Sequence, residues 1–466
     1  MRVSAVILFL CCILMPAHTR TAGAAAPLPP YDFSPEDGAL LDDISKGAFL
    51  YFLEEAHPVT GLMPDKLSAR EVCSIAAQGF GFAALPVGVE RGWVELEEAE
   101  ELALRGLRTL RDSPAQRWGF FAHYLDMETG SYSLLGYEQG VSSIDTALMI
   151  AGALVAGQYF GGEVKEIADE LYSNINWAAF RNPDRNNQVY MVWTPDDLDN
   201  YGGSGSFGSP VWGWYSDETL LINLLGIGAP TTDHRLHPYH AMRNWNRPVG
   251  RYRDGEPFVY TWPGTLFTYT FAQCFYDFSR YGPGPTGENW FLNTRAAVRA
   301  NRDWCRDNAD TYATYGQNRW GITASSGPTG YEVPGHQPRG ASGNNPMGGT
   351  LATYGAGMAV LWEPEDAMTA LRHMRTFTVR GKPLWSSPAA GGYGFRDAFN
   401  VDADWVANNV YGIAHGPMLL CIENARSGLV HDLFHSHPWI QEGMERAGFE
   451  LLQEPAPELT DILLVH

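Results

Sequence analysis

The feature that most limits what this chain can fold into is the alternation of two kinds of predicted helix. One kind is amphipathic, with apolar residues three and four positions apart, and is predicted over residues 35–56, 95–111, 163–175, 289–307 and 364–377. The other kind is rich in Ala and Gly and apolar on nearly all sides, and is predicted over residues 72–85, 143–160, 218–227, 266–278 and 349–361. A helix without a polar face must be buried all round.

This alternation predicts an all-α fold in which an inner ring of buried helices is wrapped by an outer ring of half-exposed ones. About ten to twelve helices are expected. Long Gly-, Pro- and Asn-rich connections at residues 200–213, 323–348 and 386–394 are expected to carry function, because loops of this length are uncommon otherwise. No linker divides the chain, so we expect one domain over residues 32–449, followed by a C-terminal extension at 450–466.

The N-terminus has the layout of a secretory signal. Arg2 precedes the apolar run "VSAVILFLCCILM", and the small-residue stretch "TAGAAAP" follows. We therefore expect residues 1–24 to be a cleaved signal peptide and the mature chain to be periplasmic or secreted, without contact with the membrane after cleavage. Four cysteines remain in the mature chain, too few for a disulfide framework in a protein of this length.

Charge and composition limit the possible partners. The formal net charge of −21 makes a nucleic-acid partner improbable and argues against a polyanionic substrate. The 15 Trp, 22 Tyr and 22 Phe suit a neutral oligosaccharide or polysaccharide, whose rings can pack on aromatic faces, although most of these residues are expected in the core. No CxxC or HExxH pattern occurs, so no metal or cofactor is expected. We expect a monomer.

Two of the apolar helices open with the same acidic signature. "SIDTALMI", from Ser143, aligns with "SDETLLIN", from Ser216, which pairs Asp145 with Glu218. Acids in a first helical turn are often simple caps, stabilised by roughly 0.3–1 kcal/mol through the helix dipole. That interpretation suits Asp217. It suits Glu218 less well, because a buried apolar helix leaves little solvent for a charge without a function.

Several longer motifs carry a resemblance to a known family: "GLMPDK", "GFGFAALPVGVERGW", "GFFAHYLDMETG", "SSIDTALMIAGALVAGQYF" and "YGFRDAFN…GPMLLCIENARSGL". They are similar in order and content to the glycoamylase-like domain of glycoside hydrolase family 144. The resemblance covers nearly all of the mature chain. It implies an (α/α)6 barrel, or toroid, and an endo- or exo-acting hydrolase that inverts the anomeric carbon of β-1,2-glucans or their oligosaccharides. It also implies that Glu218 is the general acid and that Asp145 is a functional acid.

Glycoside hydrolysis with inversion needs a protonated carboxylic acid and a carboxylate that activates water, commonly ~6.5–9.5 Å apart. Burial near aromatic residues would keep the proton on Glu218. The second carboxylate is expected to be Asp145 or Asp397, the latter in "GYGFRDAFN". Asp397 has an equally good alternative interpretation as a loop carboxylate bonded to backbone amides or to Arg396.

Further ligand residues are predicted around these acids. Arg91 and His123 are candidates for sugar hydroxyls, and the rings expected along the sugar path are those of Trp212, Trp214, Tyr215, Tyr393 and Trp405. Glu423 is predicted to be buried, and Arg426 is expected to be its ion-pair partner. Two positions depart from the family: an acid is replaced by Ala414 and an aromatic residue by Ala425, both expected near the cleft end of their helix.

Two other functions compete with hydrolysis. A periplasmic sugar-binding protein could keep the barrel and lose the chemistry, and the two alanine departures favour it. A polysaccharide lyase would need a Tyr/His pair and cations for a uronate, which the acidic composition disfavours. The observation that separates them is whether Glu218 and a second carboxylate face one cleft.

Overall fold

A computed structural model describes residues 31–133, 140–342 and 347–452 of the 466-residue chain. The predicted signal peptide and most of the predicted C-terminal extension lie outside these residues. The described chain is mainly helical and contains thirteen α-helices: α1 (Pro35–Glu54), α2 (Ile75–Glu90), α3 (Leu96–Asp112), α4 (Ser143–Phe160), α5 (Gly162–Asn174), α6 (Asp217–Gly228), α7 (Pro238–Arg243), α8 (Trp290–Asp307), α9 (Tyr354–Met358), α10 (Pro364–Thr376), α11 (Gly412–Arg426), α12 (Leu429–Ser436) and α13 (Pro438–Ala447).

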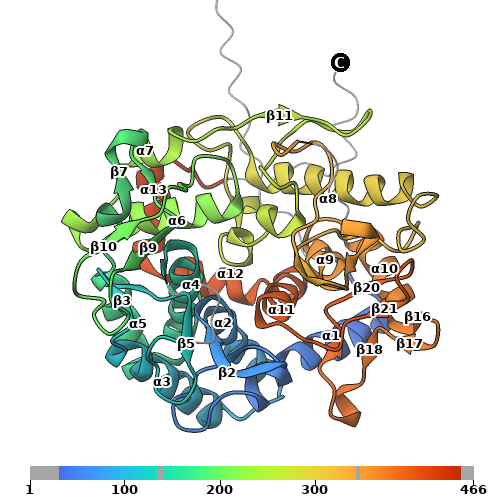
Figure 1. The fold of residues 1–466 in the computed structure, drawn as a ribbon, viewed down its shortest axis with the longest axis horizontal. Coiled ribbons are helices and arrows are strands. Elements are labelled where there is room, and N and C mark those ends of the chain that lie inside the picture. The colour runs from blue at the N-terminus through green and yellow to red at the C-terminus, as the bar shows by residue number, and fades with distance from the viewer. Residues whose placement is uncertain (1–30, 134–139, 343–346, 453–466) are drawn as a thin grey trace, which may run out of the picture.

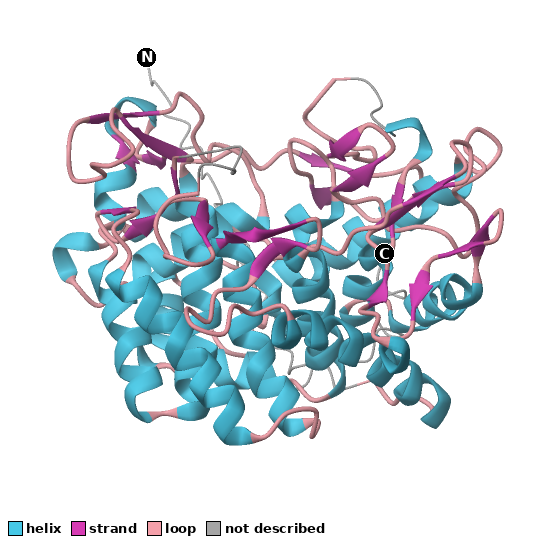
Figure 2. Cartoon of the chain, turned by 60° about the horizontal axis from the view of Figure 1, so that its bottom comes forward, coloured by secondary structure: helices cyan, strands magenta, loops and turns pink. Residues whose placement is uncertain are grey.

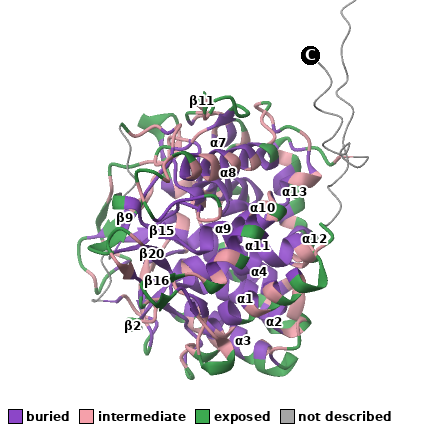
Figure 3. Cartoon of the chain, turned by 90° about the vertical axis from the view of Figure 1, so that its right-hand side faces the viewer, coloured by how far each residue is buried: buried purple, intermediate pink, exposed green. Residues whose placement is uncertain are grey.

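The helices form an inner and an outer set, as the two sequence patterns predict. In α2 every residue from Ile75 to Gly88 is buried, whereas α3 buries only one stripe, at Ala99, Leu102, Ala103, Gly106, Leu107 and Leu110. Figure 1 shows α2, α4 and α11 near the middle of the molecule and α1, α3, α5 and α10 nearer its outside. Figure 3 shows the same division as buried inner ribbons and exposed outer ones.

The contacts between inner elements form a closed circuit. Helix α2 packs on α4, α4 on α6, α6 on the short 3₁₀-helix η5 (Ala272–Cys274), η5 on α11, and α11 on α2 again. The closest crossing, between α2 and α4, depends on two glycines. A Cβ atom on Gly152 would lie 1.7 Å from the carbonyl oxygen of Gly79, so no larger residue fits there.

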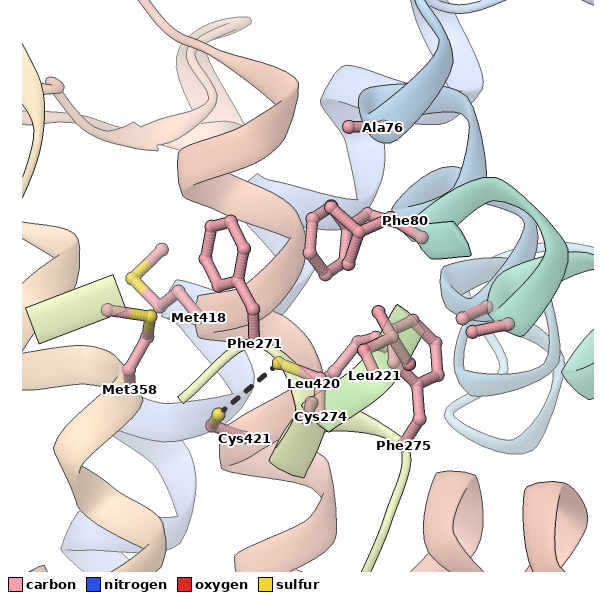
Figure 4. Packing of buried hydrophobic residues seen from close by; sticks show 14 of the residues in the cluster. Ala76, Phe80, Leu221, Phe271, Cys274, Phe275, Met358, Met418, Leu420 and Cys421 are labelled. Carbon is pink, nitrogen blue, oxygen red and sulfur yellow. Dashed lines mark hydrogen bonds between the residues drawn. The ribbon is translucent and has the colours of Figure 1, made fainter. Parts of the chain in front are cut away.

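One continuous cluster of buried apolar residues extends from Leu41 to Phe449. In Figure 4, the ring of Phe80 of α2 lies close to those of Phe271 and Phe275, which flank η5. The thiols of Cys274 and Cys421 lie 3.8 Å apart in the same region. All four cysteines of the described chain are free and buried.

The helices agree with the predicted helical class, and short strands that the sequence analysis did not predict accompany them. Short strands, mostly paired antiparallel, gather toward one end of the helices (Figure 2). They are β1 (Pro64–Lys66), β2 (Ala69–Ser74), β3 (Gln116–Arg117), β4 (Phe120–Phe121), β5 (Tyr124–Asp126), β6 (Val141–Ser142), β7 (Arg181–Asn182), β8 (Gln188–Val189), β9 (Val192–Pro195), β10 (Gly205–Phe207), β11 (Val249–Gly250), β12 (Phe258–Val259), β13 (Ser325–Gly327), β14 (Gly330–Glu332), β15 (Leu351–Ala352), β16 (Thr378–Val379), β17 (Lys382–Pro383), β18 (Trp385–Ser386), β19 (Gly394–Phe395), β20 (Ala398–Asn400) and β21 (Trp405–Val406). The segments predicted as loops therefore contain small sheets.

Two of the predicted apolar helices are broken. The segment 266–278 contains the 3₁₀-helices η4 (Leu266–Tyr269) and η5 and the start of η6 (Phe278–Arg280), and the Thr268 hydroxyl donates to Thr265 O at 2.6 Å. Residues 349–361 begin with strand β15, and helix α9 starts only at Tyr354. The helix predicted over 72–85 starts at Ile75, since Ser74 caps it and the residues before it belong to β2.

Candidate active site

A cleft of about 880 Å³ opens at the end of the molecule where the strands gather. Its walls come from segments far apart in the chain: the β1 and β5 strands, the first turns of α4 and α6, η4, the β13–β14 hairpin, the start of α9, and the segment from β21 to α11. Three carboxylates line it, namely Asp65, Asp145 and Glu218. Among the described lining residues Lys66 is the one Lys or Arg.

Glu218 lies in the first turn of α6. Its backbone N–H donates to the hydroxyl of the N-cap residue Ser216 at 3.2 Å, and that hydroxyl donates to Glu218 Oε2 at 3.0 Å. A helix N-terminus and a hydrogen-bond donor both favour the ionised form. Burial outweighs them and raises the pKa of Glu218 to about 7, with a further contribution from the negative charge of Asp145. The side chain can therefore carry a transferable proton near neutrality.

Asp145 has the equivalent place in α4. Its backbone N–H donates to Ser142 Oγ at 3.3 Å, and Ser142 Oγ in turn donates to Asp145 Oδ2. The other carboxylate oxygen lies 3.4 Å from His123 Nε2, and the His123 ring stacks on Tyr124 at 4.0 Å. In both helices the N-cap is therefore a serine, and the acid is a first-turn carboxylate that accepts a hydrogen bond from the serine hydroxyl and lines the cleft.

Asp65 is a cleft carboxylate that the sequence analysis missed. It lies in β1, is almost fully buried, and has a pKa raised above its ordinary value by desolvation, which the nearby charge of Lys66 partly offsets. Its carboxylate lies 3.7 Å from Lys66 Nζ. The signal was a charge within the otherwise buried segment "GLMPDK". Its place beside His123 and Asp145 depends on the pairing of β1, β2 and β5.

Asp397 lies directly behind the cleft wall. Ser326, which lines the cleft, donates its backbone N–H to Asp397 Oδ2 at 2.6 Å. The other oxygen, Oδ1, is buried without a hydrogen-bond partner among the described residues. Desolvation raises the pKa of Asp397 to about 6. The carboxylate therefore differs from those of Asp145 and Glu218, which are open to the cleft.

Aromatic rings cover much of the remaining wall. Of the five predicted rings the structure brings one, Trp405, to the cleft. The others that line it were not predicted: Tyr124, Phe267, Phe271, Tyr331, Tyr354 and Tyr411. Together with the carboxylates they form a surface suited to a ligand with both hydroxyl groups and C–H faces.

Four predicted rings do not line this cleft. Trp212 donates its indole N–H to Ser143 Oγ at 2.9 Å, and Tyr215 is fully buried, stacked on Trp290 at 4.7 Å. Tyr393 donates its hydroxyl to Glu55 at 2.7 Å on another part of the surface. The fourth, Trp214, packs on the ring of Trp262.

Arg91 is also outside the cleft. Its guanidinium makes a bidentate ion pair with Glu423, with two hydrogen bonds of 2.9 Å. This also corrects the partner expected for Glu423, since Arg426 pairs with Asp42 instead.

The two alanine departures are not equivalent. Ala414 is buried in the first turn of α11, next to the cleft residue Ile413. Ala425 is in the last turn, eleven residues further along, or about 17 Å at the helical rise. The expectation that both lie near the cleft end of the helix is therefore wrong for Ala425.

No cluster of three or more His, Cys, Asp or Glu side chains in the described part of the chain could hold a metal ion. Helix α4 is the one described helix long and apolar enough to cross a membrane, and 78% of it is buried inside the fold, as in a core helix.

With this geometry in place, comparison with known proteins identifies the class. Residues 210–438 match the family model described as "Glycoamylase: Putative glucoamylase". An exo-β-1,2-glucooligosaccharide sophorohydrolase (non-reducing end) of Parabacteroides distasonis is 27% identical over 440 residues, which are 88% of this chain and 58% of that protein. The chain thus spans well under two thirds of the length of this relative.

Solved structures agree. An endo-β-1,2-glucanase of Chitinophaga pinensis, in complex with sophorotriose and glucose, has a TM-score of 0.75 at 25% identity, covering 90% of this chain and 99% of that one. A β-1,2-glucanase of P. distasonis has a TM-score of 0.74 at 25% identity, covering 90% of this chain and 60% of that one. Part of the chain thus matches a glycoamylase family model, and the relatives reported above are named as β-1,2-glucan-degrading enzymes, which agrees with the resemblance predicted from the sequence.

Proposed function

We propose that this protein is an exported, inverting glycoside hydrolase that cleaves β-1,2-glucan or β-1,2-glucooligosaccharides on an (α/α)6 barrel. The single observation that carries the proposal is that Glu218, whose pKa is raised to about 7, lines the same cleft as Asp145. The substrate class rests on the relatives, which are named for β-1,2-linked glucans.

In the proposed reaction Glu218 donates its proton to the glycosidic oxygen of the departing sugar. A water molecule attacks the anomeric carbon from the opposite face, and its proton passes to a second carboxylate. The C–O bond to the leaving group breaks as the new C–O bond forms, so the product is the α-anomer. No covalent enzyme intermediate is needed.

The second carboxylate is Asp145 or Asp397. Asp145 is open to the cleft and lies close enough to Glu218 to raise its pKa. Asp397 is buried one strand behind the wall and has an oxygen available, Oδ1. As a base, Asp397 would act through an intervening group or water, and Asp145 could act directly.

The cleft supports hydrolysis over the two alternatives. A purely sugar-binding protein has no need for an acid poised near neutrality beside a second carboxylate. A lyase for uronates needs cations, and the described cleft wall offers only Lys66 together with three carboxylates.

The test is reducing-sugar release from linear β-1,2-glucan by the parent protein and by Glu218→Gln. The variant keeps the shape of the side chain but has no transferable proton, so kcat/KM is expected to fall by a factor on the order of 10² to 10⁴. Glu101→Gln, on the exposed face of α3, is the matched control and should leave the rate unchanged.

A substrate whose leaving group needs no protonation tests whether Glu218 is the general acid. On a dinitrophenyl β-sophoroside, whose leaving group departs unprotonated, Glu218→Gln should keep most of the parent activity. Proton NMR of the first product should show the α-anomer. A parent protein that releases nothing from β-1,2-glucan or its short oligosaccharides would overturn the substrate assignment, and a first product with the β-anomer would overturn inversion.

Export is proposed from the signal-like residues 1–24 alone. N-terminal sequencing of the protein recovered from the periplasm or medium should give a start near residue 25. A start at Met1 would contradict export by cleavage. A monomer at micromolar concentration is likewise proposed, to be checked by light scattering.

A further inference from the structure

Trp262 is the unusual tryptophan of this protein. The structure describes all 15, and Trp262 alone is exposed, with 52% of its surface open to solvent. A large exposed aromatic side chain is uncommon and often marks a binding surface. The ring does not line the cleft, so the proposed active site does not explain it.

The ring is fixed in place by a neighbour. Trp214 packs against it edge to face, with ring centroids 5.0 Å apart and an interplanar angle of 76°. Gly340 makes this arrangement possible: a Cβ atom there would lie 2.7 Å from Trp262 Cε3 and 2.8 Å from Trp214 Cζ3. The pair therefore forms a rigid platform, which reduces the entropy lost when a ligand packs on it.

The backbone around Trp262 is equally constrained. Trp262 O accepts a hydrogen bond from the Ala341 N–H at 2.9 Å, and Thr261 O accepts one from Gly340 at 3.1 Å. Thr261 also bonds Thr268 of η4 through their hydroxyls, at 2.9 Å. These hydrogen bonds hold the backbone of the loop in place while the Trp262 side chain remains exposed, so the side chain is available to contact a ligand.

The platform is linked to the cleft wall along the chain by three separate segments. Trp214 is four residues before Glu218, which bounds their Cα separation at about 14 Å, and its carbonyl oxygen accepts a hydrogen bond from Thr219 in the first turn of α6. Trp262 is five residues before the cleft residue Phe267. The Gly340 segment follows the β13–β14 hairpin, which also lines the cleft.

We propose that Trp262 and Trp214 form an outlying sugar-binding platform for the part of a β-linked glucan chain that extends out of the cleft. The inference rests on the proposed function and adds a determinant of chain length to it. A β-glucopyranose ring has its hydroxyl groups equatorial, so both of its faces present C–H groups that pack on indole. The ring of Trp214 also lies 6.4 Å from that of Tyr260, so the surroundings of the pair include a third aromatic ring.

The first experiment compares long and short substrates. In Trp262→Ala the ratio of KM for long β-1,2-glucan to KM for a short oligosaccharide should rise about threefold to tenfold, as expected for loss of one aromatic contact. Gly340→Ala, which displaces both rings without removing them, should change the ratio in the same direction. Tyr239→Ala, at another exposed aromatic residue on α7, is the matched control and should leave the ratio at the parent value.

A second measurement does not depend on turnover. Limited oxidation with N-bromosuccinimide should modify Trp262 first, because it is the exposed tryptophan. In the inactive Glu218→Gln background, long glucan should protect Trp262 in peptide mapping and a disaccharide should not.

The outcomes are distinct. A parent protein without activity on any β-1,2-glucan defeats the proposed function. If the parent hydrolyses glucan but Trp262→Ala leaves the KM ratio unchanged and glucan does not protect Trp262, the platform proposal is wrong and the proposed function stands. A change of oligomeric state in Trp262→Ala, measured by light scattering, would overturn the platform proposal in favour of contact between two copies of the chain.

Discussion

Glu218 at the cleft and two acids away from it, Glu363 and Glu423, have opposite surroundings. On the outside of the molecule, Glu363 at the start of α10 is contacted by Arg295 and Arg299 of α8, at 2.6 and 2.8 Å. Glu423, in α11, accepts hydrogen bonds from two of the three guanidinium nitrogens of Arg91, Nε and Nη2. In the cleft, the hydrogen-bond partner of the Glu218 carboxylate is the hydroxyl of Ser216.

This difference decides which acids can react. An arginine partner holds a carboxylate in a charge-assisted hydrogen-bonded pair, so that the acid has a structural role. The cleft removes water from Glu218 without supplying a cation, and a second acid, Asp145, lies nearby, so the neutral form persists to about pH 7. The same residue type thus becomes a structural ion pair or a proton donor according to its surroundings.

The largest expected effects are on catalysis by the second carboxylate. Asp145→Asn and Asp397→Asn should each lower kcat/KM by a factor on the order of 10² or more, because both variants keep the size of the side chain and lose the basic oxygen or its charge. Azide can replace the water in the variant that lacks the base, so one of the two should regain turnover and form an α-glycosyl azide. Asp310→Asn, at an exposed turn, is the control.

Rescue identifies the base and leaves the other acid as a ligand or positioning residue. Rescue of neither variant would contradict the proposed inverting mechanism.

Substitutions in the ion pair between Arg91 and Glu423 should change the free energy of unfolding. Glu423→Gln leaves Arg91 partly buried without its partner, and the free energy of unfolding should fall by about 2–4 kcal/mol. Urea denaturation at pH 7 measures it. The double variant Arg91→Met with Glu423→Leu should recover most of the loss, since apolar replacement of a whole pair is often neutral. An unchanged stability in Glu423→Gln would show that solvent already screens the pair.

Glu218→Gln should have the opposite effect on stability. In the unfolded chain Glu218 ionises near its ordinary pKa, while the folded protein retains the proton to about pH 7. Folding stability therefore falls as pH rises between these two values and is then constant, and below both values there is no penalty. At pH 8 the variant should be more stable than the parent by about 1–3 kcal/mol, and at pH 4 the two should be equal.

Urea denaturation of the variant and the parent at pH 8 and at pH 4 tests the sign of this difference in folding stability. Equal stability of variant and parent at pH 8 would mean that Glu218 is not desolvated and would weaken its assignment as the acid.

Local periodicity predicted much of the helical structure. The segment 95–111 corresponds to α3, at Leu96–Asp112, because its spacing of apolar residues depends on neighbours one turn away. The segment 266–278 failed because its structure depends on distant residues: Gln273 turns its backbone N–H and side chain toward Asp217 of α6, with contacts of 3.3–3.4 Å. Such contacts have no signature in the local sequence.

The prediction of the site residues was limited in the same way, because local sequence does not reveal distant contacts. Glu218 and Asp145 could be found because a charge at the start of an apolar helix is conspicuous in a sequence. Asp65 has a weaker signal, a charge in the mostly apolar segment "GLMPDK", and its place at the cleft depends on the pairing of β1 with β2. Tyr215 was assigned to the sugar path because it is near Glu218 in sequence, but in the extended segment before α6 successive side chains point to opposite sides, and that of Tyr215 enters the core.

The smallest expected effect is the pH dependence of the parent enzyme, which compares the two kinds of acid in one protein. Since Glu218 must be protonated to act, kcat/KM should fall about tenfold per pH unit above a pKa near 7. Replacing the ion-paired Glu423 by Gln should leave this limb in place, because that carboxylate is held by Arg91 and takes no part in proton transfer. Initial rates on a short β-1,2-glucooligosaccharide between pH 5 and 9 measure both. A basic limb that persists unchanged in the residual activity of Glu218→Gln would assign the ionisation to another group, and the contrast between cleft and ion-paired acids would then fail at its central residue.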